Sequence, residues 1–288
     1  MLTLFSVPKP FVGRVATLQS NALATWRQLG AEIEILLFGS EQGVAEAADA
    51  VHAVHVPELE QNENGTPLVS DLFARAQARA RFDELCYVNA DILLPPSLLP
   101  AIEGVREVAE SALIVGQCRN LEVDRGIDGW DTAMERAAMG APLRGPGGID
   151  YLVFPRGLFD SLPPFALGRA GFDNWLIWYA HSRRVPVVDV TSVVPSVHQN
   201  HEYEHVPGGK EEAYFGTEAW RNHELAGGQL HLFNIDDATH RFTREGLRRN
   251  GLAPLRTFPP LRWLALRAGE LERWLRGASV PKPARTGL

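Results

Sequence analysis

Residues 85–94 read LCYVNADILL, an apolar run interrupted by Asn89 and Asp91. The apolar part is typical of a strand buried on both faces of a parallel sheet, and we predict one strand over residues 84–94. Burying an unpaired carboxylate is costly, so Asp91 should be paired, coordinated or placed at the end of the strand. There, side chains two residues apart point to the same side. The stretch therefore predicts a central strand whose carboxyl end presents Asn89 and Asp91 together.

Strand and helix patterns alternate on both sides of this stretch. Apolar runs predict further strands over residues 2–7, 33–39, 50–56 and 112–118. Helical spacing of apolar residues predicts helices over residues 15–29, 66–80 and 98–109. The second is expected to have Thr66 as its N-cap and Pro67 at its first helical position. Strands joined through helices imply an α/β fold with a mainly parallel sheet covered on both faces. In such sheets ligands bind beyond the carboxyl ends of the strands.

Composition narrows the class of protein. The chain has 288 residues, of which 45% are hydrophobic and 22% charged, and its formal net charge is -7. This composition is typical of a soluble globular enzyme, and the negative charge disfavours a nucleic-acid partner. Cys86 and Cys118 lie in apolar runs and predict buried thiols in a reducing compartment. No signal-peptide pattern and no apolar run of about 18 residues is found, so we expect a cytoplasmic protein without a transmembrane segment.

Within this pattern, Asn89-Ala90-Asp91 resembles the DXD motif of GT-A-fold glycosyltransferases, which use nucleotide-diphosphate sugars. In that family the last acid ligates Mn²⁺ or Mg²⁺ and the first contacts the ribose or the metal. Here Asp91 matches the last position, while Asn89 replaces the first acid. An amide can hydrogen-bond a ribose hydroxyl but is a poorer metal ligand than a carboxylate. The resemblance implies a single GT-A-like (Rossmann-like) domain over residues 1–205, with a loop and helical extension over residues 206–288 packed on it.

A second element of the resemblance is His198, in SVHQNHEYEH. Many GT-A enzymes supply a metal-ligating histidine from a late loop, and His198 is similar to that residue. A neutral imidazole suits Mn²⁺. His201 and His205 compete for the role, and the three histidines together are an alternative zinc site, although their spacing fits no zinc signature that we know.

Asp173, in GRAGFDNWLIW, precedes a predicted helix and suits the position of its N-cap. The resemblance implies that Asp173 is the general base for the acceptor hydroxyl if the enzyme inverts, or positions sugar or acceptor if it retains. The family's usual pair of adjacent acids is Asp173-Asn174 in this chain. The helix dipole is expected to lower the pKa of this carboxylate and keep it ionised at neutral pH.

The segment GPGGIDYLVF resembles a loop and strand that enter the cleft of such transferases. Gly147 and Gly148 permit a close backbone approach to a ligand. Asp150 is expected to hydrogen-bond sugar hydroxyls, the alternative being a turn in which it satisfies its own backbone.

The segment SVPKPFVGR, after the first predicted strand, resembles the nucleotide-base pocket of GT-A proteins. Backbone groups around Pro8 are expected to contact the base, and Lys9 or Arg14 to approach the phosphates. Arg119, just after Cys118, is another cation expected on the same rim. For each of these cations an ordinary surface charge is the alternative.

The carboxy-terminal stretch predicts one further helix, over residues 259–277. Leu264, Leu271 and Leu275 share one of its faces, with Trp263 and Trp274 alongside. Such a stripe is expected to pack on the protein's own core or on a second subunit, as in a homodimer. Because arginines occur at positions 262, 267, 273 and 276, a peripheral contact with an anionic membrane surface is the alternative.

These features predict a metal-assisted glycosyltransferase of the hexosyltransferase type, which moves a sugar from a nucleotide-diphosphate donor to an acceptor hydroxyl with Mn²⁺ or Mg²⁺. A catalytically silent nucleotide- or carbohydrate-binding protein of the same fold is the main alternative, because Asn89 departs from the motif. A metal hydrolase that uses the late histidines is another. A nucleotidyltransferase is disfavoured, since it would need a Gly-rich phosphate-binding loop where this chain has PKPFVGR.

Overall fold

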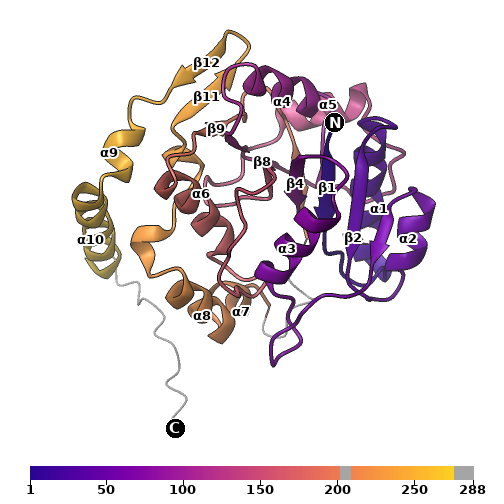
Figure 1. Cartoon of the computed structure of the whole chain (residues 1–288), viewed down its shortest axis with the longest axis horizontal. Coiled ribbons are helices and arrows are strands. Elements are labelled where there is room, and N and C mark those ends of the chain that lie inside the picture. Colours follow the sequence, from indigo (N-terminus) through magenta and orange to yellow (C-terminus); the bar gives the residue numbers. More distant parts are fainter. Residues whose placement is uncertain (202–208, 276–288) are drawn as a thin grey trace.

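The computed structural model describes residues 1–201 and 209–275 and shows a mixed α/β architecture (Figure 1). The strands are β1 (Thr3–Ser6), β2 (Glu34–Phe38), β3 (Val54–Val56), β4 (Glu84–Val88), β5 (Ile92–Leu93), β6 (Leu113–Val115), β7 (Arg119–Leu121), β8 (Tyr151–Pro155), β9 (Val187–Asp189), β10 (Val197–Gln199), β11 (His240–Thr243) and β12 (Gly246–Arg249).

Helices cover both faces of the larger of two sheets. They are α1 (Gly13–Gln28), α2 (Val44–Ala50), α3 (Val69–Arg79), α4 (Leu98–Arg106), α5 (Thr132–Gly140), α6 (Phe172–Ser182), α7 (Gly209–Phe215), α8 (Thr217–Leu225), α9 (Ala253–Thr257) and α10 (Pro259–Leu275), with two short 3-10 helices, η1 (Gln229–His231) and η2 (Ile235–Asp237). Among the described residues, no helix combines the length and the apolar character that crossing a bilayer requires.

The central sheet has nine strands in the order β12-β11-β9-β6-β8-β4-β1-β2-β3. Most neighbouring pairs are parallel, as predicted, whereas β8 runs antiparallel between β4 and β6, and β12 antiparallel to β11. The predicted α/β class with a mainly parallel, helix-covered sheet is confirmed. The last two strands of the sheet come from residues after 205, a contribution that the sequence did not predict.

Strand β4 shows how the sheet separates two cores. Its side chains alternate, so that Cys86 and Val88 face a cluster that includes residues of α1, α2 and α4. Leu85 and Tyr87 face a second cluster, with residues of α3 and α6. Alternation along a strand places successive side chains on opposite faces. Both faces are apolar because helices cover both, which explains the continuous run that the sequence shows. Cys86 and Cys118 are buried free thiols.

The predicted strand over residues 84–94 is in fact two strands separated by Asn89-Ala90-Asp91. Strand β5 leaves the central sheet and joins a three-stranded sheet in the order β5-β10-β7. There, Ile92 pairs with His198 and Leu93 with Val197 in antiparallel register. The small sheet thus brings residues from the last third of the chain beside the polar tripeptide.

The helix predicted to have Thr66 as its N-cap begins at Val69, and Leu68, in extended conformation, is its N-cap. Thr66 and Pro67 belong to a local turn, in which the amide of Asn62 donates to the carbonyl of Thr66 and Gln61 forms a β-bridge with Pro67. The expected capping position was therefore wrong by two residues, because those residues pair with the loop before the helix.

Candidate active site

The polar tripeptide forms a tight turn at the carboxyl end of β4. The amide of Ile92 donates to the carbonyl of Asn89 at 3.1 Å, and the amide of Asn89 donates to the carbonyl of Asp150 at 2.9 Å. Ser6, at the end of β1, donates its hydroxyl to the carbonyl of Val88 at 2.6 Å. The turn is thus fixed to the ends of both neighbouring strands, which aims its side chains out of the sheet edge.

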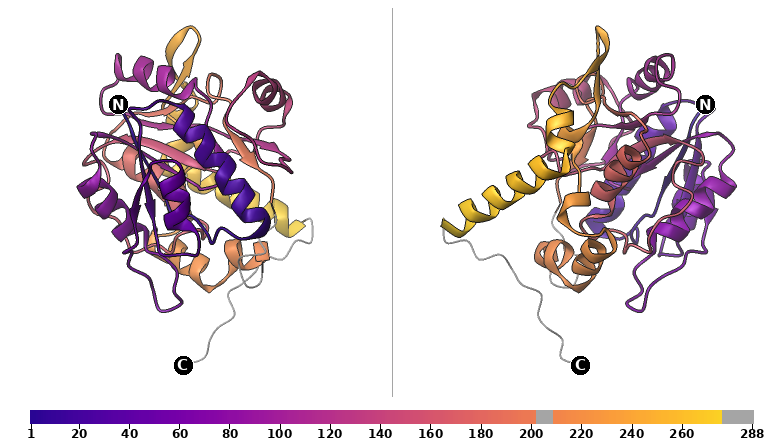
Figure 2. Two further views of the ribbon diagram at one scale, coloured as in Figure 1. Left: turned by 90° about the vertical axis from the view of Figure 1, so that its right-hand side faces the viewer. Right: turned by 60° about the vertical axis from the view of Figure 1, so that its left-hand side comes forward.

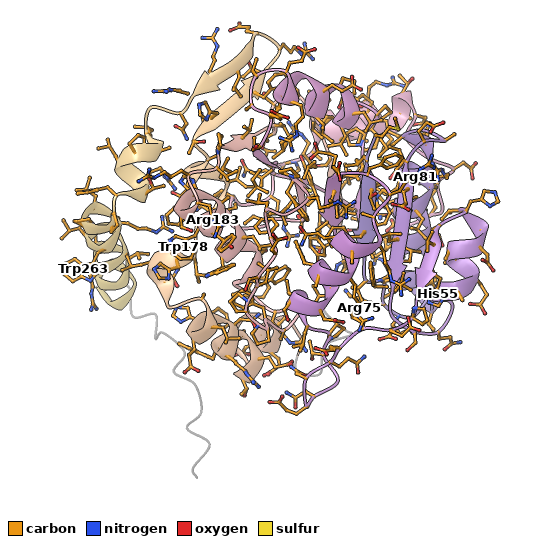
Figure 3. The ribbon with its side chains drawn as sticks, viewed as in Figure 1. His55, Arg75, Arg81, Trp178, Arg183 and Trp263 are labelled. Atoms are coloured by element: carbon orange, nitrogen blue, oxygen red, sulfur yellow. The ribbon has the colours of Figure 1, made fainter. Side chains whose placement is uncertain are left out.

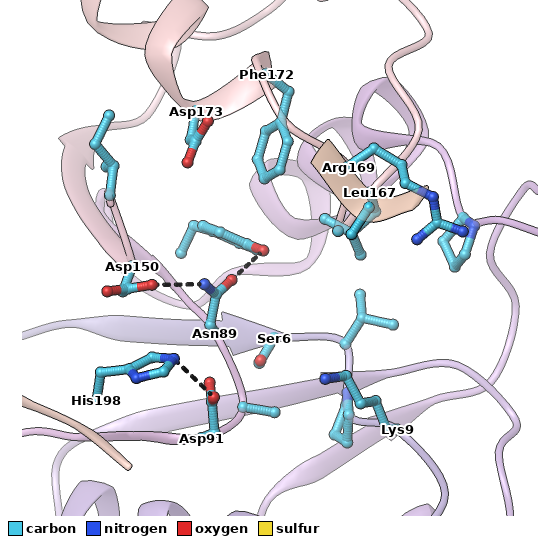
Figure 4. A pocket seen from close by; sticks show the side chains of 18 of the residues that line it. Ser6, Lys9, Asn89, Asp91, Asp150, Leu167, Arg169, Phe172, Asp173 and His198 are labelled. Carbon is cyan, nitrogen blue, oxygen red and sulfur yellow. Dashed lines mark hydrogen bonds and ion pairs between the residues drawn. The ribbon is translucent and has the colours of Figure 1, made fainter. Parts of the chain in front are cut away.

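A cavity of about 410 Å³ lies beyond these strand ends. Its lining includes eight of the residues that the sequence predicted for the site: Pro8, Lys9, Asn89, Asp91, Gly148, Asp150, Asp173 and His198. Figure 4 shows Asp91, His198 and Lys9 on one side of this space and Asp173 on the other, at the start of α6. Residues distant in sequence thus lie in one cavity beyond the carboxyl ends of the strands, where the sequence predicted a ligand site.

Asp91 lies against two imidazoles. Its Oδ2 is 2.8 Å from Nε2 of His201 and 3.5 Å from Nε2 of His198. One potential ligand atom from each of these three residues lies within 4.8 Å of the others. The buried side-chain amide of Gln199 donates to the main-chain carbonyl of Asp91 at 2.9 Å, which locks the turn to the strand that carries His198.

The protonation states suit a divalent cation. Burial by itself would raise the pKa of Asp91, but the hydrogen bond from His201 and the charges on His198, His201 and Lys9 outweigh it and hold the pKa well below its usual value. Burial lowers the pKa of His198, although the negative charge of Asp91 opposes this shift. Metal ions bind the neutral form of the imidazole. Nδ1 of His198 is buried and has no hydrogen-bond partner among the described residues. One carboxylate and two imidazoles form a donor set that fits Mn²⁺ and related divalent ions.

Of the three predicted candidate histidines, the structure places His198 and His201 together at Asp91, whereas His205 lies outside the described residues. His198 was predicted in a loop, but it lies on strand β10. His201 lies two residues after the end of this strand. Nothing in the sequence favoured His201 over His205.

Asn89 points toward Asp150. Its Oδ1 accepts a hydrogen bond from the Tyr87 hydroxyl at 2.7 Å, and its Nδ2 donates to Oδ1 of Asp150 at 3.2 Å. The amide supplies both a donor and an acceptor at this position, which a carboxylate cannot do. Asn89, which replaces the first acid of the motif, therefore satisfies both Tyr87 and Asp150 in this chain.

Asp150 is almost fully buried and also faces Arg144, whose Nε lies 3.4 Å from its Oδ2. A Cβ atom at Gly148 would collide with the Arg144 side chain, so the glycine allows the guanidinium to cross the loop and reach the cavity. Arg144 was not predicted for the site, although it lies four residues before Gly148 at the start of a glycine-rich loop.

Asp173 occupies the second position of α6, while Gly171 is the N-cap with φ of 106°. The predicted cap was therefore misplaced. Burial raises the pKa of Asp173 to about 7, with a further contribution from Asp150, and the hydrogen bond from the Asn174 amide opposes it only in part. The expected lowering by the helix dipole was wrong, because desolvation outweighs it. A carboxyl group with this pKa exchanges a proton readily near neutral pH.

Asn174, the next residue, braces the start of α6 against the segment before η2. Its Nδ2 donates to the carbonyl of Phe233 at 2.7 Å, and its own carbonyl accepts from the amide of Phe233 at 3.1 Å. This two-sided contact fixes the helix turn from which Asp173 enters the cavity.

Lys9 and Pro8 lie in the loop after β1, which Gln19 of α1 holds by two hydrogen bonds to the main chain of Lys9, at 2.7 and 2.9 Å. Burial lowers the pKa of Lys9, and the nearby charge of Asp91 opposes that shift. Lys9 and Asp91 line the same cavity, so a positive charge on Lys9 can meet an anionic group that binds there.

Arg14 and Arg119 are not among the residues that line the cavity. Arg14 is half-exposed and ion-paired with Glu122. Arg119, on β7, donates from Nη1 to the carbonyl of Ala141 at 2.7 Å. The structure thus does not bring these two predicted cations to the site.

A further arginine that the sequence analysis missed, Arg169, lines the cavity near the start of α6. Its Nη2 lies 2.8 Å from Oε2 of Glu218, which is buried on α8. Nδ2 of Asn62 donates to the other carboxylate oxygen at 2.6 Å. Glu218 thus connects α8 both to the segment before α6, through Arg169, and to the loop before α3, through Asn62. Arg169 lies on the side of the cavity away from Asp91 and His198 (Figure 4).

Comparison with known proteins bears on the fold. Glucosyl-3-phosphoglycerate synthase from Mycobacterium tuberculosis, solved in complex with Mg²⁺ and UDP, matches with a TM-score of 0.50 and 16% identity, over 80% of this chain and 80% of that chain. The chain has a GT-A fold. The same synthase with Mn²⁺, UDP and phosphoglyceric acid matches this GT-A chain with a TM-score of 0.49 and 15% identity, over 80% of this chain and 79% of the other.

The resemblance drawn from the sequence is thus confirmed for the GT-A fold. No model of a protein family matches the chain. No match was found among curated proteins either.

Proposed function

We propose that this protein transfers a sugar from a nucleoside-diphosphate sugar to an acceptor hydroxyl, with a divalent cation held by Asp91, His198 and His201. The observation that carries the proposal is the presence of these three ligands and Asp173 in one cavity at the strand ends of a GT-A fold. The synthase of similar fold was solved with Mg²⁺ and UDP, which supports a nucleotide diphosphate as the donor's leaving group.

The donor is proposed to bind along the side of the cavity formed by Lys9, the polar tripeptide and Arg144. A bound Mn²⁺ or Mg²⁺ would act as a Lewis acid toward the diphosphate. Lys9 and Arg144 add fixed positive charge where negative charge grows as the sugar leaves. Asp150 accepts hydrogen bonds from sugar hydroxyls, and Asn89 keeps it oriented through the 3.2 Å contact.

The acceptor is proposed to bind between the donor and the start of α6. With inversion at the anomeric carbon, Asp173 takes the proton of the acceptor hydroxyl, and its pKa of about 7 suits that role at neutral pH. With retention, the same carboxylate orients the acceptor by a hydrogen bond. NMR of the product's anomeric configuration distinguishes these two roles.

The proposal is tested by two measurements on the whole protein. UDP, GDP, CDP and dTDP are screened by thermal shift with and without Mn²⁺, since a ligand that binds the folded state raises its apparent stability. Nucleotide release is then measured from the sugar donor of the stabilising nucleotide. Absence of any shift at millimolar nucleotide overturns the proposal. A Mn²⁺-dependent shift without release, with acceptors of varied hydroxyl chemistry, identifies a binding protein instead.

A further inference from the structure

Positive charge is concentrated in residues 241–269. This segment has seven arginines, no lysine or aspartate and one glutamate, a net charge of +6, whereas the whole chain carries -7. Arg241, Arg256 and Arg262 pair with three aspartates outside the segment, Asp189, Asp236 and Asp237, which leaves an excess of +3. The arginines at positions 244, 248, 249 and 267 are exposed. An acidic protein that keeps one strongly basic segment has a surface suited to an anionic partner.

The same segment exposes large apolar side chains. Six of the fourteen exposed large hydrophobic side chains among the described residues lie within it, and they are between 41% and 63% exposed: Leu252, Leu255, Phe258, Leu261, Trp263 and Leu264. Single exposed apolar residues are ordinary on a protein surface, but six within thirteen positions form a patch of the kind that marks an interaction site.

Helix α10 presents its apolar side outward. Leu261, Leu264, Ala265 and Ala268 have the spacing of one helix face, and all are exposed. The inner side carries Arg262, Leu266 and Gly269, which are all less exposed. Arg262 is mostly buried and lies 3.1 Å from the buried carboxylate of Asp237. A helix on a soluble protein usually turns its apolar stripe toward the core, whereas most of the apolar side chains described on α10 face outward.

The figures show the position of this helix. In the right-hand view of Figure 2, α10 extends away from the body of the molecule. Trp263 lies at its outer edge (Figure 3). The anchor is at the amino-terminal end, where the Arg262 guanidinium lies 4.3 Å from the centre of the Phe233 ring. A protruding helix that is anchored at one end can lie flat on a surface without disturbing the central sheet.

We propose that α9 and α10 form a docking surface for an anionic phospholipid bilayer. The exposed apolar side chains enter the boundary between headgroups and acyl chains. Arg267 on α10 and the exposed arginines of the β11–β12 hairpin meet lipid phosphates and carboxylates. Charge favours this occupant over a second copy of the chain. A two-fold interface brings the same patch against itself. The positive charge that Asp189, Asp236 and Asp237 leave over, +3 on each copy, would then repel its like.

The proposal is tested by flotation of the full chain with vesicles of phosphatidylcholine, alone or mixed with phosphatidylserine. Binding is expected only with phosphatidylserine and should weaken as salt is added. Leu264→Glu is expected to lower the partition constant about tenfold or more, and Arg267→Glu about fivefold or more. Val108→Glu, at a 62% exposed apolar site after α4, is the matched control and should leave binding unchanged.

Three results would overturn the proposal. One is absence of binding to the phosphatidylserine vesicles at low salt. Another is an equal loss of binding in Leu264→Glu and Val108→Glu, or no loss in either. The third is a concentration-dependent dimer in light scattering that Leu264→Glu abolishes, in a protein that does not bind vesicles, which would assign the patch to a second copy.

Discussion

Nε2 of His201 lies 2.8 Å from Oδ2 of Asp91, although 110 positions separate the two residues in the chain. The contact exists because β5 and β10 pair next to it, with Ile92 opposite His198. The pairing of these two short strands places one carboxylate and two imidazoles around one point. In many metalloproteins a single sequence motif places the ligands in this way. Substitutions of Asp91 and His201 are therefore expected to have separate, measurable effects on metal binding.

Asp91→Asn should abolish the Mn²⁺-dependent part of any nucleotide-induced thermal shift, because a neutral amide replaces the charged ligand. Turnover should fall by about two orders of magnitude or more. Asp160→Asn changes an exposed aspartate in the same way and serves as the control. If Asp91→Asn keeps a full Mn²⁺-dependent shift, the metal site has been assigned to the wrong carboxylate.

His201→Ala should weaken Mn²⁺ binding about tenfold or more in isothermal titration, since it removes one of three protein ligands. His52→Asn is the matched control: this exposed histidine has φ of 52°, a conformation that asparagine tolerates. Unchanged Mn²⁺ affinity in His201→Ala would show that His201 is only a hydrogen-bond partner of Asp91.

The pH dependence of kcat/KM should report Asp173. Because its pKa in the folded protein is about 7 and the proposed base is the ionised form, activity should rise as the pH increases through about 7 and then level off. Asp173→Asn should lower kcat by about 10²- to 10⁴-fold and remove this rising limb. A wild-type profile that is flat between pH 6 and 8 (about one unit on each side of the pKa) would contradict a role as base.

The same carboxyl group should make folding stability depend on pH. Its pKa is raised in the folded state, so the folded protein binds this proton more tightly than the unfolded chain does. Its stabilising contribution is therefore present at low pH and is lost as the pH rises toward about 7. Asp173→Asn should be more stable than the wild type to urea above pH 7, where the wild type carries a desolvated charge. Equal urea midpoints at high pH would show that Asp173 is well solvated.

Asn89→Asp restores the acid that the family motif has at this position, yet it should destabilise this protein. The new carboxylate would face Oδ1 of Asp150, to which Asn89 donates at 3.2 Å, and would remove that donor. A loss of about 1–3 kcal/mol in the free energy of unfolding is expected without metal. Asn64→Asp, at an exposed position, is the control. An unchanged unfolding free energy would mean that the two side chains are not coupled.

The sequence predicted those helices and strands whose own residues show a regular apolar pattern. Apolar spacing located α1, α4 and α6, and the run before Asn89 located β4, because both faces of that strand are covered by helices. The break between β4 and β5 was missed. The residues after Asp91 are as apolar as those before it, but they are buried in a different sheet.

Long-range pairing explains the other differences. The insertion of β8 between β4 and β6, and the addition of β11 to β9, leave no periodic signal in the sequence. For the candidate site, resemblance to a motif predicted Asp91, His198 and Asp173, which the structure places in one cavity. Arg144 and Arg169 line the same cavity but come from irregular loops, which carry no such pattern. The pKa of Asp173 was predicted in the wrong direction, since the helix start is visible in the sequence but the depth of burial is not.

The contacts of Arg262 mean that the final helix is not a dispensable tail. Its guanidinium pairs with Asp237 and lies over the ring of Phe233. The main chain of Phe233 in turn hydrogen-bonds Asn174, the neighbour of Asp173. A chain cut before Pro259 would therefore lose one of the two arginines that pair with Asp237, and a support for helix α6, which carries Asp173. Shortened versions made to simplify crystallisation or expression would be poor substitutes for the whole protein in any assay of its chemistry.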